Sequence, residues 1–99
     1  MINFEKALSI AISEKNKLTT ASRNVMLTRA KDCGEFWSIS YCFTNKSGEK
    51  YETYGPKMRF DISKVNGTIL DYPPYRPGTK YGNLYDKGKL LDIPEEYKN

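Results

Sequence analysis

The pattern of apolar and polar positions predicts one helix at the start of the chain. Apolar side chains recur at i, i+3, i+4, i+7 and i+8, the spacing of a single buried helical stripe: Phe4, Ala7, Leu8, Ala11 and Ile12. Asn3 is a suitable N-cap, and the polar run after Asn16 is a suitable stop. We therefore expect a helix over residues 3–16 that packs against a core.

Alternation of apolar and polar residues predicts strands in the middle of the chain. The clearest strand covers residues 35–44, where four large side chains share one face: Trp37, Ile39, Tyr41 and Phe43. That face is expected to lie under the helix. Further strands are predicted over the following ranges: 24–31, 57–63 and 68–72, with an optional short strand over 50–54 before Gly55-Pro56.

The Asn66-Gly67 pair separates the last two predicted strands and is typical of a tight hairpin. Asn-Gly supplies the two positive-φ residues of a type I′ turn, so these strands should be antiparallel neighbours. Counting outward from this turn places Asp61 opposite Tyr72 and Asp71 opposite Ile62. The two carboxylates then point to opposite faces, which is poor geometry for a glycosidase or a metal pair.

From Tyr72 onward the regular pattern is lost. Prolines stiffen this segment and glycines loosen it, and Ile93–Tyr97 is the one stretch expected to form a helical turn, with Pro94 first. Five of the eight tyrosines lie here: Tyr72, Tyr75, Tyr81, Tyr85 and Tyr97. We expect an extended segment over residues 73–99 that wraps along the sheet.

These elements predict a single α+β domain over residues 1–99. Its N-terminal helix packs on a four- to five-stranded antiparallel meander over residues 24–72, followed by an irregular, Tyr/Pro-rich C-terminal segment. A chain of 99 residues has room for one core and no separate catalytic lobe.

The net charge of +4 is concentrated in residues 15–31, a stretch with no acid and five cations: Lys15, Lys17, Arg23, Arg29 and Lys31. Such a stretch favours an acidic partner, whether phosphate, a carboxylate-rich protein or anionic lipid. The alternative is an ordinary solvated face of mixed charge.

The start of the chain predicts a cytoplasmic protein that does not enter a membrane. Glu5 and Lys6 interrupt any signal-like apolar run, and no stretch reaches the roughly 20 apolar residues of a span. In the predicted hairpin Cys33 lies in the loop and Cys42 about 25 Å up the strand, too far apart for a disulfide. We expect two free thiols, in agreement with a reducing compartment.

Catalysis and metal binding are not expected from this composition. The chain has no histidine, the commonest general base and metal ligand. Two distant cysteines do not make a structural zinc site, and no Gly-rich phosphate loop is present. The prediction is a non-catalytic protein with no cofactor and no metal site.

Short motifs over residues 1–72 resemble a bacterial family. They are Met1-Ile2-Asn3-Phe4-Glu5-Lys6-Ala7, the strand containing Trp37, and Gly55-Pro56 leading into Phe60-Asp61-Ile62 and Asn66-Gly67-Thr68-Ile69. Together they look like the small YrhB-like proteins, also called the immunity protein 35 family. The resemblance implies a non-catalytic immunity protein that neutralises a cognate toxin of the same bacterium by direct contact.

Tyrosine and arginine are enriched at interface hot spots, so we predict that the residues contacting the toxin are of these types and of similar charge. They lie in the C-terminal segment and the last hairpin: Tyr72, Tyr75, Arg76, Lys80, Tyr81 and Tyr85, with Arg59 on the exposed face of its strand. The positive charge of the chain suggests an acidic surface on the toxin.

Two alternatives stay open. One is a small nucleic-acid-binding module, in which the cations of residues 15–31 contact phosphates and the tyrosines of the C-terminal segment stack on bases. The other is an accessory subunit whose C-terminal segment docks on a larger complex.

Overall fold

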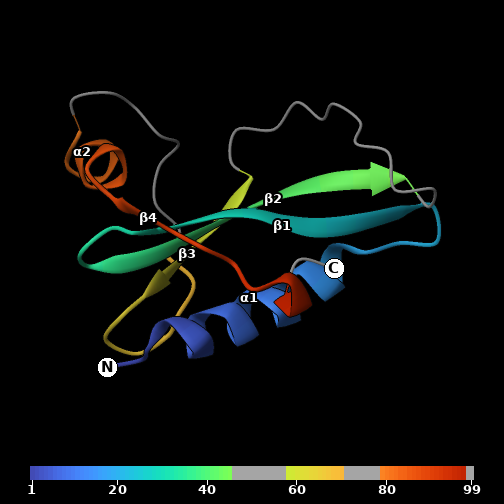
Figure 1. Ribbon diagram of the computed structural model, residues 1–99, viewed down its shortest axis with the longest axis horizontal. Coiled ribbons are helices and arrows are strands. Elements are labelled where there is room, and N and C mark those ends of the chain that lie inside the picture. Colours follow the sequence, from blue (N-terminus) through green and yellow to red (C-terminus); the bar gives the residue numbers. More distant parts are fainter. Residues whose placement is uncertain (46–57, 71–78, 98–99) are drawn as a thin grey trace.

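The computed structural model describes residues 1–45, 58–70 and 79–97. In chain order its elements are α1 (Phe4–Leu18), β1 (Arg23–Asp32), β2 (Phe36–Asn45), β3 (Arg59–Ser63), α2 (Lys80–Asp86), β4 (Lys89–Leu91) and the 3₁₀-helix η1 (Glu95–Tyr97). Figure 1 shows α1 on one side of the sheet and α2 on the other. The predicted α+β arrangement, an N-terminal helix packed on an antiparallel sheet, is confirmed.

Helix α1 begins at the predicted cap. The Asn3 Oδ1 atom accepts a hydrogen bond from the Lys6 amide at 2.9 Å, which satisfies one of the free donors of the first turn. Leu8 is 1% exposed, and it packs in the same buried cluster as Ala7 and Ala11. The helix continues past Asn16 to Leu18, because Leu18 packs against the core and its burial outweighs the weak local stop.

The sheet has the strand order β3-β2-β1-β4, with every pair antiparallel. The first three strands form the expected meander. The fourth comes from the C-terminal segment that was expected to be irregular: β4 pairs with the end of β1, Ala30 opposite Leu91. Of the predicted strand over residues 68–72, the described part (68–70) forms one isolated bridge, Ile62 to Ile69, and residues 71–72 lie outside the described residues. Residues 50–54 lie outside the described residues.

The hairpin after β3 forms, but the predicted type I′ turn is wrong. Among the described residues only glycines have positive φ, and in this loop only Gly67 does. Ser63 and Thr68 close a four-residue loop through a 2.9 Å backbone hydrogen bond. The Asn66 side chain accepts from the Thr68 amide instead of placing its own backbone at positive φ.

The longer loop shifts the register of this hairpin by two residues. Ile62 lies opposite Ile69 rather than Asp71, and the Leu70 amide donates to the Asp61 carbonyl at 2.7 Å. The predicted pairing of Asp61 with Tyr72 is therefore wrong. Asp71 and Tyr72 themselves lie outside the described residues.

The main core lies between α1 and the sheet, and the end of the chain completes it. Leu27, Ile39 and Ile62 are fully buried on this side. After β4 the chain crosses back towards α1, as Figure 1 shows, and Ile93 enters the same core at 8% exposure. The predicted turn near the end is confirmed as η1, closed by the Tyr97 amide on the Pro94 carbonyl at 2.9 Å.

None of the helices in the described part of the chain has both the length and the apolar character needed to cross a membrane.

Candidate partner-binding surface

The structure places three of the predicted contact residues and part of a fourth. Lys80 is the first residue of α2, Tyr85 lies near the end of that helix, and Arg59 begins β3. Tyr81 belongs to α2, but its side chain is outside the described part. The other three predicted residues also lie outside the described residues: Tyr72, Tyr75 and Arg76.

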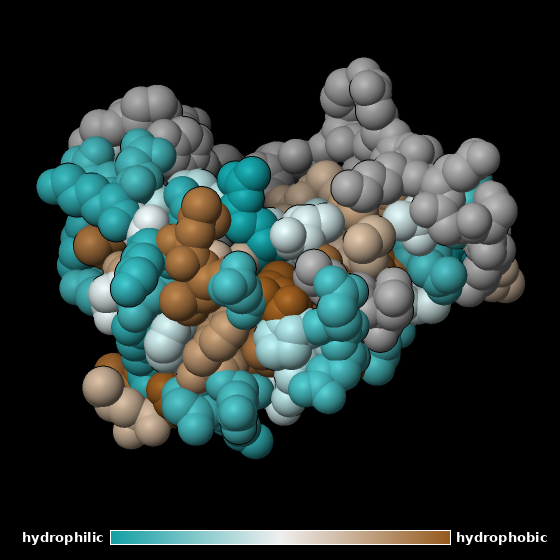
Figure 2. Space-filling view, in the orientation of Figure 1, coloured by the Kyte–Doolittle hydropathy of each residue, from teal (hydrophilic) through white to brown (hydrophobic). Residues whose placement is uncertain are grey.

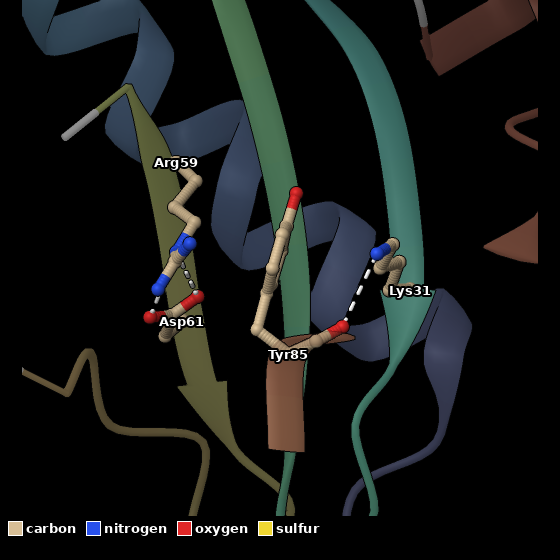
Figure 3. Close-up of polar contacts among 4 residues, drawn as sticks. All are labelled: Lys31, Arg59, Asp61 and Tyr85. Atoms are coloured by element: carbon tan, nitrogen blue, oxygen red, sulfur yellow. Dashed lines mark hydrogen bonds and ion pairs between the residues drawn. The ribbon is translucent and has the colours of Figure 1, made fainter. Parts of the chain in front are cut away.

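Tyr85 anchors α2 to the face of the sheet opposite α1. The Lys31 ammonium lies 4.1 Å from the centre of its ring, and the Arg59 guanidinium carbon lies 4.2 Å from it. Figure 3 shows the ring between these two cations, with the Lys31 Nζ atom also donating to the Tyr85 carbonyl at 3.1 Å. Each cation–π contact contributes about 0.5–2 kcal/mol. Tyr85 and its neighbours therefore hold α2 in place.

Arg59 is engaged inside this cluster rather than presented to solvent. Its side chain is only 11% exposed, and its Nε atom lies 3.2 Å from the carboxylate of Asp61, which is fully buried. Arg59 was expected on an exposed strand face. The face is the expected one, opposite α1, but α2 covers it, and no pattern in the sequence predicted that helix.

A different surface gathers exposed apolar residues at one end of the sheet. Three segments meet there: the N-terminus, the β1–β2 turn and the hairpin loop 64–67. The Ile2 amide donates to the Lys64 carbonyl at 2.8 Å, and the Lys64 amide donates to the Glu35 carbonyl at 3.2 Å. These backbone bonds join segments far apart in sequence into one frame, which we call the turn-end surface.

The turn-end surface is hollowed and partly apolar. A cavity of about 380 Å³ is lined by residues of all three segments: Met1, Gly34, Glu35, Ser63, Lys64 and Val65, together with Leu70. Met1 is 95% exposed and Val65 is 73% exposed. Figure 2 shows apolar atoms at the lower left, where the N-terminus lies in Figure 1. Lys80 of α2 adjoins this surface through an ion pair with Glu35 at 3.5 Å.

Charged contacts hold the loop of this surface in place. The Lys64 ammonium pairs with Asp32 and lies 4.2 Å from the centre of the Trp37 ring. Burial alone would raise the pKa of Asp32, but the hydrogen bonds from Lys64 and from the Gly34 amide, with the charges of Lys64 and Lys89, lower it below its ordinary value. Asp32 is therefore ionised at neutral pH, and the contact is lost only as the pH falls through that lowered pKa.

The cations of residues 15–31 do not form one exposed patch. Lys15 is buried, Lys17 pairs with Glu14 at 3.1 Å, and Arg23 stacks on the Phe43 ring at 4.3 Å. Lys31 lies against Tyr85 on the other side of the sheet, while Arg29 is exposed. These cations are neighbours in the sequence, but helix and strand geometry turns their side chains toward several different surfaces.

Both cysteines are free, as predicted. Cys33 is 3% exposed, and Cys42 is partly exposed. Burial, followed by the negative charge of Asp61, raises the pKa of Cys33 to about 11, and the nearby cations Lys31 and Arg59 oppose this only in part. Cys33 is thus a packed structural thiol with little thiolate at neutral pH.

The difference between the thiols gives a direct test of the packing. With a disulfide reagent at pH 8, the Cys42→Ser variant should react about two orders of magnitude more slowly than an ordinary exposed thiol, because thiolate is scarce at a pKa of about 11. The Cys33→Ser variant should react quickly. Both should react at equal rates in denaturant, and a fast folded-state reaction of Cys42→Ser would contradict the burial of Cys33.

Within residues 1–45, 58–70 and 79–97, no group of three acidic, cysteine or histidine side chains is placed to hold a metal ion. Comparison with protein-family models, with curated proteins and with solved structures finds no match to this chain.

The turn-end surface was missed in the sequence because its parts are far apart along the chain. Val65 precedes the Asn66-Gly67 pair and Met1 precedes the helix cap at Asn3, so neither position in the sequence indicates that the two residues lie at one surface. One signal was present: an apolar residue next to a turn, where polar residues are usual, has no local reason to be there.

Proposed function

We propose that this chain is a non-catalytic binding protein whose turn-end surface docks on another protein. The observation that carries the proposal is the pair of exposed apolar side chains, Met1 and Val65, beside a cavity of about 380 Å³. Interfaces bury apolar anchors at their centre and keep charged groups at their rim. Here Lys64, Lys80 and Glu35 supply such a rim.

The partner that fits best is a protein with an acidic surface. The chain carries a net charge of +4, and the exposed Lys80 adjoins the turn-end surface through Glu35. Opposite charge steers encounter and raises the association rate. The resemblance to the immunity protein 35 family suggests the identity of that partner: a toxin of the same bacterium, neutralised in the cytoplasm by direct contact.

The frame of the turn-end surface supports rapid binding. The loop 64–67 is held by backbone bonds to the N-terminus and to the β1–β2 turn, and by the pairing of Lys64 with Asp32. A surface already held in its binding conformation loses little conformational entropy on association. An immunity protein needs this property, because it must capture its toxin before damage occurs.

The test compares two exposed apolar residues on different surfaces. Val65→Glu should raise the Kd for the toxin at least tenfold, because a carboxylate would enter an apolar contact facing an acidic partner. Leu90→Glu is the matched control, since Leu90 is 63% exposed but lies on β4. We would measure Kd by calorimetry with the purified product of the neighbouring reading frame as the candidate toxin, and growth of cells that produce both proteins.

Protection by the wild type and by Leu90→Glu, but not by Val65→Glu, would support the proposal. No binding by the wild type, or an equal loss in both variants, would contradict it. The nucleic-acid alternative predicts a different result: tight binding of a labelled single-stranded oligonucleotide that weakens steeply with salt. The dispersal of the cations from residues 15–31 over several surfaces speaks against that outcome.

A further inference from the structure

A second cavity lies at the other end of α1, where the last turns of this helix approach β1. Its volume is about 400 Å³, and its lining is mixed polar and apolar: Lys15, Asn16, Asn24, Val25, Met26 and Thr44, together with Thr19. Helix α1 has 15 residues, so it separates this cavity from the N-terminus by about 20 Å. The cavity is therefore distinct from the turn-end surface.

Lys15 is the unusual residue of this cavity. It is only 7% exposed, and its Nζ atom donates to the Val25 carbonyl at 3.1 Å. Strand β4 pairs only with the far end of β1, from Ala30 to Asp32. In the described part of the sheet, the edge of β1 at Val25 therefore has no neighbouring strand, and the lysine satisfies this carbonyl instead.

Among the described residues that line the cavity, none carries a charge that matches Lys15. A carbonyl satisfies one donor of the ammonium group but carries no net charge, and no carboxylate is among the described residues that line the cavity. Glu14, its neighbour in sequence, pairs with Lys17. Burial lowers the pKa of Lys15, as expected of a cation withdrawn from water without a counter-ion.

The remaining donors in the cavity suit an anion. An ammonium group has three donors, and the Val25 carbonyl uses one of them. Two further polar residues, Thr44 and Asn16, line the same cavity, and Thr44 is 4% exposed. Met26, which is partly exposed, adds apolar surface beside these polar groups. This combination resembles small-molecule sites, in which a few polar groups orient a partly apolar ligand.

We propose that this cavity, the Lys15 pocket, binds a small organic monocarboxylate. The carboxylate accepts hydrogen bonds from the Lys15 ammonium and the neighbouring polar side chains, and the short hydrocarbon part contacts Met26. One buried cation matches one negative charge. A phosphate dianion would remain under-compensated here and lacks an apolar part for the rest of the lining.

The experiment is a titration of the whole chain with butyrate, followed by amide NMR. Butyrate should shift the amides of Asn16, Asn24 and Thr44 saturably, while sodium chloride at equal ionic strength should not. The Lys15→Gln variant should bind butyrate at least tenfold more weakly. Lys6→Gln is the matched control, because it removes the same charge from an exposed position on α1 and should leave the affinity unchanged.

A second measurement keeps the proposal testable if Lys15→Gln fails to fold. In the wild type labelled with ¹³C-lysine, saturating butyrate should raise the pKa of Lys15, since a bound anion favours the charged ammonium. A rise of one pKa unit corresponds to about tenfold tighter butyrate binding by the protonated form. The absence of saturable shifts, equal shifts with chloride, tighter binding of phosphate than of butyrate, or an unchanged Lys15 pKa would each overturn the proposal.

Discussion

Arg59→Met should destabilise the protein by about 3–5 kcal/mol, because it leaves the Asp61 carboxylate buried without its guanidinium partner. Asp61 is fully buried, and Arg59 contacts it at 3.2 Å. The same change also removes one of the two cations that hold the Tyr85 ring, so α2 should loosen. Urea denaturation followed by tryptophan fluorescence would measure the loss.

Two further variants separate charge burial from loss of packing. Arg29→Met removes an exposed arginine from the adjacent part of β1 and should change the stability by less than about 0.5 kcal/mol. The double variant Arg59→Met/Asp61→Leu removes both charges and should recover most of the stability. If the double variant is as unstable as Arg59→Met alone, the buried ion pair is not the cause.

Leu8→Ala should cost about 2–5 kcal/mol, because it opens a cavity where α1 packs on the sheet. Leu8 is 1% exposed and lies in the same cluster as Leu27 and Ile39. Leu90→Ala removes the same atoms from a side chain that is 63% exposed, so its cost should stay below about 1 kcal/mol. The midpoints of denaturant unfolding of the two variants provide the comparison.

Similar losses from these two leucine variants would contradict the placement of the core between α1 and the sheet. A small loss from both would mean that α1 is not anchored by its apolar stripe. A large loss from both would mean that Leu90 is buried in solution, which would also remove it as the control for the turn-end surface.

The helix and strands that the sequence predicted correctly have a long periodic pattern of apolar residues, which indicates the element without knowledge of its partners. Helix α1 has an apolar stripe from Phe4 to Ile12 and a capping asparagine, and β2 alternates from Trp37 to Thr44. The antiparallel pairing of β1 with β2 follows from the three-residue connection between them, Cys33–Glu35. In these regions local preference and tertiary packing agree.

The elements that were missed are short and depend on distant partners. Helix α2 has seven residues with a glycine inside, too few to be stable alone, and Tyr85 holds it through cations on β1 and β3. Strand β4 has three residues and no alternation, and it forms because the edge of β1 is free to pair with it. Neither condition is visible in the residues of the element itself.

In the candidate sites too, the sequence predicts residue types but not the contacts between distant residues. Sequence patterns predicted cationic and aromatic contact residues, among them Lys80, Tyr85 and Arg59. They did not indicate that Tyr85 and Arg59 contact each other, or that Lys15 of the basic stretch is buried at the edge of β1. A contiguous run of charged residues does not show which way each side chain points, because a helix and a strand turn successive side chains to different sides.

The amino-acid sequence by itself determined the fold class, the first helix, the central strands and the two free thiols, since each depends on local periodicity or on chain distance. The tertiary structure alone decided three things: that a C-terminal strand closes the sheet, that α2 covers its second face, and that Met1 and Val65 meet at one end of it. The physical reason is that these features form through contacts between residues distant in sequence. Such contacts become favourable only when the rest of the chain has already placed both partners.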